Sequence, residues 1–206
     1  MRKSVSIRED ARYNRCTDRK ESGAQNVRID NEARLIQRAR QGDLAAVSEL
    51  YNLHVARIYQ YVRYRTGDDQ TAEDITAEVF LRAIEGLGSY NDQGAPFIAW
   101  LYLIAQARIV DFWRSSKRRQ TAPLDDPLLQ DGLVATDEDI DVDFLQHQSL
   151  QSALEQLTDE QQNVIILKFV QGLGNAEIAQ ILGKTEGAVK ALQRRALETL
   201  ARLLNQ

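Results

Sequence analysis

Between residues 32 and 117, hydrophobic residues recur at intervals of three and four, which places them on one side of successive helices. The pattern predicts four helices, three ending at glycine and the last running to about Ser115. The glycines are Gly42, Gly67 and either Gly86 or Gly88. The apolar residues of these helices, expected to form their buried stripes, are Leu35, Ile36, Ala39, Leu50, Leu53, Ile58, Tyr61, Val62, Ile75, Val79, Phe80, Ala83, Ile84, Phe97, Trp100, Leu101, Ile104, Ala105 and Ile109.

Helical spacing returns at His147 and continues to the C-terminus. Thr158 and Gln161 have the spacing of a capping box, which predicts the start of a helix. Gly172 and Gly183 end the next two helices, and the last helix begins near Thr185. The apolar residues expected on the buried faces here are Leu150, Leu154, Leu157, Val164, Ile165, Leu167, Phe169, Ile178, Ile181 and Leu182.

The chain between these two helical stretches has no sustained apolar stripe and contains Pro123, Pro127 and Gly132. Its residues 121–146 carry eight acidic and no basic side chains, which indicates a flexible acidic linker. The sequence therefore predicts an all-α fold of two small helical domains. The expected order is a mostly disordered extension at 1–31, a domain at 32–117, a linker at 118–146 and a domain at 147–206.

The stretch NAEIAQILGKTEGAVKALQRRALETL, residues 175–200, predicts a helix-turn-helix, because a short helix, a glycine turn and a longer helix follow one another. Glu186, Lys190 and Arg194 recur every four residues on the second helix, where they can enter a major groove together. A plain helical hairpin with a solvated basic face is the alternative. The residues assigned to DNA are Lys184, Thr185, Glu186, Lys190, Arg194 and Arg195, the first two at the helix N-terminus where phosphate is favoured.

Composition narrows the classes of function without choosing one. The 206 residues include one cysteine, Cys16, and two distant histidines, a poor set of metal ligands that also allows no internal disulfide. The sequence has no stretch of about 18 apolar residues and no secretory signal, so a cytoplasmic protein without membrane insertion is expected. Since no carboxylate pair or phosphate-cradling loop matches a catalytic motif, neither an enzyme nor a cofactor is predicted.

Two segments together resemble the extracytoplasmic-function (ECF) group of bacterial RNA polymerase sigma factors. AEDITAEVFLRAIEGL and, after a loop, FIAWLYLIAQARIVDFWRSSKRR resemble region two of that group. LEQLTDEQQNVIILKFVQGLGNAEIAQILGKTEGAVKALQRRALETL resembles region four. The order of the two segments, their spacing and the acidic linker match the layout of the group, and residues 1–31 lie outside the resemblance.

The resemblance implies a factor that binds core RNA polymerase, through the β′ coiled coil and the β flap, and directs it to promoter DNA. It assigns Asp74, Glu78, Phe80 and Arg82 to the polymerase contact. The alternative is that Phe80 belongs to the core and that the acidic residues form a solvated face. It also implies control by an anti-sigma factor, a role in stress response, and an acidic linker suited to a basic groove of the polymerase.

The resemblance further implies that the loop from Gly88 to Ala95 and the following helix capture an unpaired base of the −10 element. For Trp100 a core position is the favoured interpretation, because it lies on the apolar stripe. Leu103, Gln106 and Ala107 depart from the basic residues and asparagine usual in this helix. The residues assigned to the −10 element are Tyr90, Asn91, Asp92, Trp100, Arg108, Arg114, Lys117, Arg118 and Arg119.

Two other classes of protein compete with this interpretation. One is a decoy with a sigma-like fold, which binds an anti-sigma factor without driving transcription and should lack the polymerase clamp or the basic reading face. The other is a regulator in which an N-terminal sensor controls the helix-turn-helix, which needs a ligand pocket or phosphoacceptor within residues 32–117. Asp74 and the pair Lys190 and Arg194 favour the sigma factor over the decoy.

Overall fold

The computed structural model describes residues 31–91, 96–121 and 150–204, and these are folded into helices joined by short turns, with no strand among them. The predicted all-α class is therefore confirmed for the described chain. The predicted extension and nearly all of the predicted linker lie outside these ranges. The helices are 31–40, α2 (Leu44–Thr66), α3 (Asp69–Gly86), α4 (Phe97–Thr121), 150–155, α6 (Asp159–Ile165), η1 (Ile166–Val170), α7 (Asn175–Leu182) and α8 (Glu186–Leu204).

The described residues form two compact units, and the chain passes from one to the other within α2. The first unit joins the residues up to Leu53 with Leu87–Ser89. Its first helix is followed by Gly42, whose φ of 86° favours glycine. Asp43 then begins α2, because its Oδ1 accepts hydrogen bonds from the backbone N–H groups of Ala45 and Ala46 at 3.0 and 3.3 Å.

The second unit, His54–Gly86 with Tyr90–Gln206, contains α3, α4 and all the later helices. In its N-terminal part, α3 packs against α4, and the rings of Tyr61 and Tyr102 meet edge to face at 5.0 Å. The predicted apolar stripes supply most of this core, and Ala72 and Tyr102 are buried in addition to them. Its buried side chains are Ile58, Tyr61, Val62, Ala72, Ile75, Val79, Leu101, Tyr102, Ala105 and Ile109.

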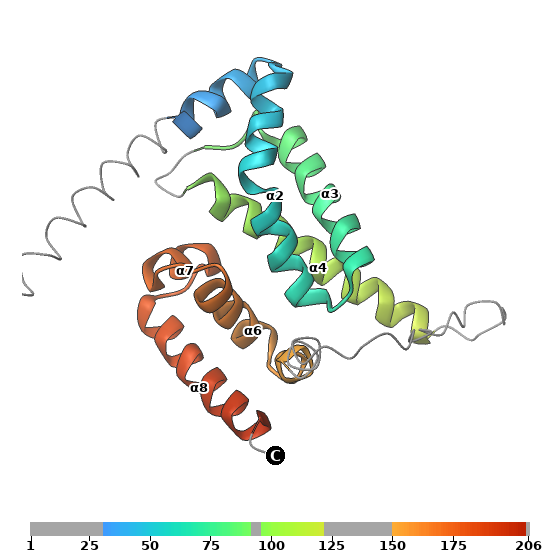
Figure 1. Cartoon of the computed structure of the whole chain (residues 1–206), viewed down its shortest axis with the longest axis vertical. Coiled ribbons are helices and arrows are strands. Elements are labelled where there is room, and N and C mark those ends of the chain that lie inside the picture. Colours follow the sequence, from blue (N-terminus) through green and yellow to red (C-terminus); the bar gives the residue numbers. More distant parts are fainter. Residues whose placement is uncertain (1–30, 92–95, 122–149, 205–206) are drawn as a thin grey trace, which may run out of the picture. The chain divides into compact units, whose positions relative to one another are not determined.

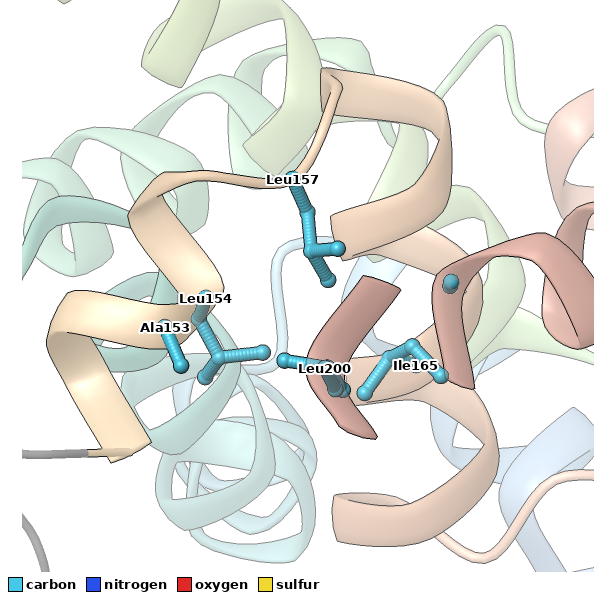
Figure 2. Packing of buried hydrophobic residues seen from close by; sticks show 6 residues of the cluster. Ala153, Leu154, Leu157, Ile165 and Leu200 are labelled. Carbon is cyan, nitrogen blue, oxygen red and sulfur yellow. The ribbon is translucent and has the colours of Figure 1, made fainter. Parts of the chain in front are cut away.

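In the C-terminal part of the same unit, α8 packs against both α6 and α7 (Figure 1). Leu154, Leu157, Ile165 and Leu200 converge in one apolar cluster, so helix 150–155, α6 and the end of α8 share a core (Figure 2). The predicted capping box is confirmed, because the hydroxyl of Thr158 accepts from the N–H of Gln161 and the side chain of Gln161 accepts in return.

The predicted domain boundaries remain a prediction, since residues 122–149 lie outside the described chain. The structure groups the helices on either side of that segment in one compact unit. In that unit α4 contacts α7, and polar side chains of α2 and α4 meet side chains of α6 and Gln171.

Four details of the predicted helices are wrong. Leu53 and Ile84 are exposed, because the buried arcs of α2 and α3 are narrower than the apolar pattern suggests. Phe169 is also exposed: it lies in the wide π-turn η1, which shifts the helical phase and breaks the interval of 3.6 residues. Helix α4 runs to Thr121, past the expected end near Ser115.

Candidate nucleic-acid and protein interfaces

The turn between α7 and α8 is built by Gly183 and Thr185. Gly183 has a φ of 61° and ends α7 in the left-handed conformation, and the next N–H, of Lys184, donates to the carbonyl of Ala179 at 2.8 Å. The hydroxyl of Thr185 accepts from the N–H of Ala188 at 3.2 Å and so caps α8. Ala179 and Val189 are buried between the helices. The predicted helix-turn-helix is thereby confirmed as a local structure.

The predicted reading face of α8 is open to solvent. Glu186, Lys190 and Arg194 are all exposed, and so is Arg195. An ion pair on this face, between Arg194 and Glu198, is long at 3.8 Å and solvated. Such a pair is worth little, so it leaves the guanidinium available to another partner.

The two residues predicted at the N-terminus of α8 already have partners within this part of the chain. Nζ of Lys184 lies 2.7 Å from Oε1 of Glu160 in an ion pair with α6. Thr185 caps α8 through its lone pair, which leaves its O–H free to donate to a phosphate oxygen. Lys184 must exchange Glu160 for phosphate to act as predicted, whereas Thr185 can do both at once.

Helix α3 presents a mixed acidic and apolar surface. Asp74 and Arg82 are exposed, as the polymerase assignment requires, but Phe80 is buried, which corresponds to the core alternative. Leu81, which is 57% exposed, and Ile84 lie on the outside of the helix instead. Sequence periodicity missed these two residues, because a leucine and an isoleucine at helical spacing normally indicate core.

The aromatic residues assigned to the −10 element form a packed cluster at the start of α4. The ring of Tyr90 lies 5.3 Å from that of Phe97 and 5.0 Å from that of Trp100, and the last two rings are 5.5 Å apart. Gly86 closes on this cluster, since a Cβ there would approach the Trp100 ring to 3.3 Å. Tyr90 is buried and Asn91 exposed, while Asp92 lies outside the described residues.

Cations along α4 differ sharply in how they are held. The guanidinium of Arg108 is 22% exposed and pairs with Glu78 at 3.1 Å and with Asp111 at 2.6 Å. Because Glu78 belongs to α3, its ion pair with Arg108 holds α3 and α4 together in this structure. The pair thus joins Glu78, which was assigned to the polymerase contact, to Arg108, which was assigned to DNA. Arg114, which is 73% exposed, only approaches Asp111 at 4.0 Å.

At the far end of α4, Lys117 and Arg118 are both exposed, and Arg118 donates from Nε to the carbonyl of Arg114 at 3.4 Å. Arg119 belongs to the same helix, but its side chain lies outside the described residues. The structure therefore brings Arg114, Lys117 and Arg118 together at one basic end of α4.

Two features are absent from the parts of the chain that the structure describes. No group of three or more histidine, cysteine, aspartate and glutamate side chains there could hold a metal ion. No helix there is long and apolar enough to cross a bilayer.

Two family models match this chain. The model of Sigma-70 region 2 matches residues 50–119, and the model of Sigma-70, region 4 matches residues 147–200. The ECF RNA polymerase sigma factor BldN of Streptomyces coelicolor is 40% identical over 82% of this chain, which spans 64% of the length of BldN. The ECF RNA polymerase sigma factor SigD of Mycobacterium tuberculosis is 32% identical over 77% of each chain.

A solved structure agrees at the level of the fold. The sigma factor RpoE, in complex with the anti-sigma factor NepR from Bartonella quintana, aligns with a TM-score of 0.60 and 22% identity. The alignment covers 77% of this chain and 96% of RpoE.

Proposed function

The chain belongs to the ECF RNA polymerase sigma factors, and on that premise we propose that it binds core RNA polymerase in the cytoplasm and directs it to specific promoters. The observation that carries the proposal is the exposed face of Glu186, Lys190 and Arg194 on α8, in a chain whose other half matches region 2. The polymerase performs the chemistry, so the proposal gives this chain no catalytic residue and no cofactor.

In the proposed mechanism, region 4 reads the −35 element as duplex. A major groove admits one helix, and α8 offers it two cations and an acid at successive turns. Lysine and arginine can hold phosphates or guanine edges, and glutamate can accept from cytosine. Thr185 adds a hydroxyl donor at the helix N-terminus, where the peptide dipoles also favour phosphate.

Region 2 is proposed to melt the −10 element and hold one strand. The basic end formed by Arg114, Lys117 and Arg118 would bind the phosphates of that strand. Asn91 directly follows Tyr90, whose ring packs against that of Trp100, so these rings give Asn91 a rigid base from which to hold an unpaired nucleotide. Arg108 serves in this proposal as a strut between α3 and α4.

For the polymerase contact we propose the exposed side of α3. Asp74 and Arg82 supply charges that set register, and Leu81 with Ile84 supplies apolar area that Phe80, being buried, does not. An exposed helix with charges and apolar area can pack along a coiled coil, and that of the β′ subunit is the proposed partner. The β flap is the proposed partner of region 4.

Control by an anti-sigma factor is part of the proposal. The solved relative RpoE is bound by such a factor, and a partner that covers α3 or α8 would block the contacts proposed above.

The sequence between the two regions is acidic, which suits a basic groove of the polymerase.

The proposal is tested by run-off transcription with core RNA polymerase and genomic fragments. We expect the wild type to initiate at discrete start sites, and Asp74→Ala or Leu81→Ser to lower the yield at limiting polymerase by roughly tenfold or more through weaker binding. Glu73→Ala is the matched control, since it removes the neighbouring exposed acid from a different side of the same helix.

A decoy gives a different set of results. It would bind an anti-sigma factor but yield no specific transcript and no complex with core polymerase. That outcome would contradict the proposed function. If Asp74→Ala and Glu73→Ala instead reduce the yield of transcript equally, the proposed polymerase-binding side of α3 is contradicted.

A further inference from the structure

One side of α4 is exposed from its middle to its basic end. The exposed positions on this side are, in order along the helix, Leu103, Ala107, Val110, Arg114 and Lys117. At about 100° per residue, these five positions fall within an arc of about 80°. The first part of the exposed side is therefore apolar, and the second part is basic.

The three apolar residues form a continuous run, defined here as Leu103, Ala107 and Val110. Leu103 is 47% exposed and Val110 is 36% exposed. A single exposed aliphatic residue is ordinary on a protein surface, but a helix of a bundle normally carries polar residues on the side that faces water. Apolar residues at successive turns of that side therefore indicate a surface for a partner.

The structure leaves the apolar run without an apolar cover. All three residues line an open cleft of about 480 Å³, and Leu182 is the one apolar residue that lines it from outside α4 within the described chain. The other lining residues outside α4 are charged or polar, and Glu160 and Lys184 are among them. The run thus faces water and charged groups, and its apolar area remains available to a ligand.

The cations that follow the run indicate what kind of ligand this is. Arg114 is 73% exposed, and it belongs to the basic end of α4 that is proposed above to bind the phosphates of the −10 strand. Val110 lies one helical turn from Arg114 and Ala107 lies two turns away, which is about 5 and 10 Å along the helix axis. A strand bound at the basic end reaches that far within two or three nucleotides, at about 3.4 Å per step.

Phosphate contacts position a strand but carry no information about its sequence, so any selection must come from contacts to the bases. The edges of the bases present hydrogen-bond donors and acceptors, which an aliphatic side chain cannot satisfy. The C5-methyl group of thymine is the apolar group on these edges, and apolar side chains contact it. The methyl group stays on the base when the strands separate, so an apolar run can recognise thymine in paired and unpaired DNA alike.

We propose that the apolar run of α4 contacts the methyl groups of thymines in the −10 element, while the basic end of the same helix holds the phosphates of that strand. The run spans about 10 Å, so it covers two or three neighbouring nucleotides. The factor thereby selects promoters that carry thymine at those positions. This inference rests on the proposed function, because it names the bases that region 2 prefers.

Deoxyuridine provides the test, because it is thymidine without the C5-methyl group. Promoters of the wild type are first mapped by run-off transcription, and each thymine of the −10 element is then replaced in turn. The promoter DNA is left unpaired across this element, so that the effect of the methyl group on melting does not enter. The affinity of the holoenzyme, measured by fluorescence anisotropy, should fall about fourfold for each contacted methyl group that is removed.

The variant Leu103→Ala/Val110→Ala shortens the apolar run and keeps residues that favour a helix. Its holoenzyme should bind the thymine promoter more weakly than the wild type does, and deoxyuridine should then cause almost no further loss, because the two changes remove the same contact. Leu53→Ala is the matched control, since Leu53 is an exposed leucine of region 2 on α2, with an exposed fraction of 51%. It should keep the full fourfold loss with deoxyuridine.

Three results would overturn the inference: mapped −10 elements that lack thymine, equal affinity for thymine and deoxyuridine promoters, or a loss with deoxyuridine that persists in Leu103→Ala/Val110→Ala. If that variant keeps the deoxyuridine effect and binds core polymerase more weakly, the run contacts a protein instead of DNA. A wild type that yields no specific transcript contradicts the proposed function itself, whereas normal transcription without a methyl effect contradicts only the role of the apolar run.

Discussion

Helices α4 and α8 both carry cations assigned to promoter DNA, but they hold them in different ways. On α8, Lys190 and Arg194 are exposed at successive turns, and Arg194 is held only by a long, solvated ion pair. On α4, Arg108 is largely buried and bound to carboxylates of both α3 and α4. A helix that enters a preformed groove can keep its charges in water, whereas a helix inside a bundle uses part of its charge to hold the bundle together.

The same contrast extends to the apolar residues. Helix α8 rests on Val189, Ala196 and Leu200 and leaves its charged side exposed. Helix α4 is buried along one side in the core of region 2, and it contacts α7 of region 4 as well. Substitutions on the exposed side of α8 should therefore change DNA binding without changing stability. Substitutions of cations on α4 should divide into those that lower stability, as at Arg108, and those that leave it nearly unchanged, as at Arg114.

The largest expected effect is on α8. In Lys190→Ala/Arg194→Ala, the polymerase holoenzyme should bind duplex promoter DNA roughly 10²-fold more weakly, because each of these side chains contributes about 1–3 kcal/mol. The slope of log affinity against log salt should become shallower by up to about two, near 0.9 for each phosphate that is no longer neutralised. Fluorescence anisotropy across a salt series measures both quantities.

Arg202→Ala is the control for that variant, since it removes one cation from the last turn of the same helix. It should change the affinity by less than about threefold. If Arg202→Ala weakens binding as much as the double variant does, the net charge of α8 matters and its reading face does not.

Local sequence signals were sufficient for the helix-turn-helix. A left-handed glycine at Gly183, a capping threonine at Thr185 and an apolar contact at Val189 are each set by neighbours a few residues away. The exposure of Lys190 and Arg194 then follows from helical geometry alone. The local fold and the candidate DNA-reading face of α8 could both be predicted here, because neither depends on residues far away in the sequence.

Region 2 could be predicted only in outline. Whether Phe80 or Leu81 faces outward depends on how α3 is rotated against its neighbours, and the interval between apolar residues fits either side of the helix. The pairing of Arg108 with Glu78 joins residues thirty positions apart, so no local pattern reports it. The π-turn at Phe169 is likewise invisible to a search that assumes 3.6 residues per turn.

Within α4, the paired cation Arg108 and the exposed cation Arg114 should differ in their effect on stability. Arg108→Ala should lower the free energy of unfolding by about 1–2 kcal/mol, between the values for exposed and fully buried ion pairs, because it leaves Glu78 and Asp111 without their cation. Arg114→Ala, at an exposed position, should change it by less than about 0.5 kcal/mol. Urea denaturation of the two variants measures the difference, and equal effects would show that Arg108 is not a strut.

The smallest predicted effect concerns an exposed pair that joins α2 to α3. Arg63 hydrogen-bonds Asp69, and the hydroxyl of Tyr59 donates to the same carboxylate; together these lower the pKa of Asp69 below its ordinary value of 3.8. Because the folded pKa is depressed, the pair stabilises the fold above about pH 4, and this contribution is lost as the pH falls through the folded pKa.

Asp69→Asn should therefore lower the free energy of unfolding by less than about 1 kcal/mol at pH 7, since the carboxylate is mostly in water. The deficit should be the same at about pH 5 and should shrink at about pH 3, where the wild-type carboxyl begins to take up its proton. Glu73→Gln removes another carboxyl from α3 and controls for net charge. A deficit that persists unchanged at the lower pH would mean that the geometry of the Asp69 side chain, and not its charge, joins α2 to α3.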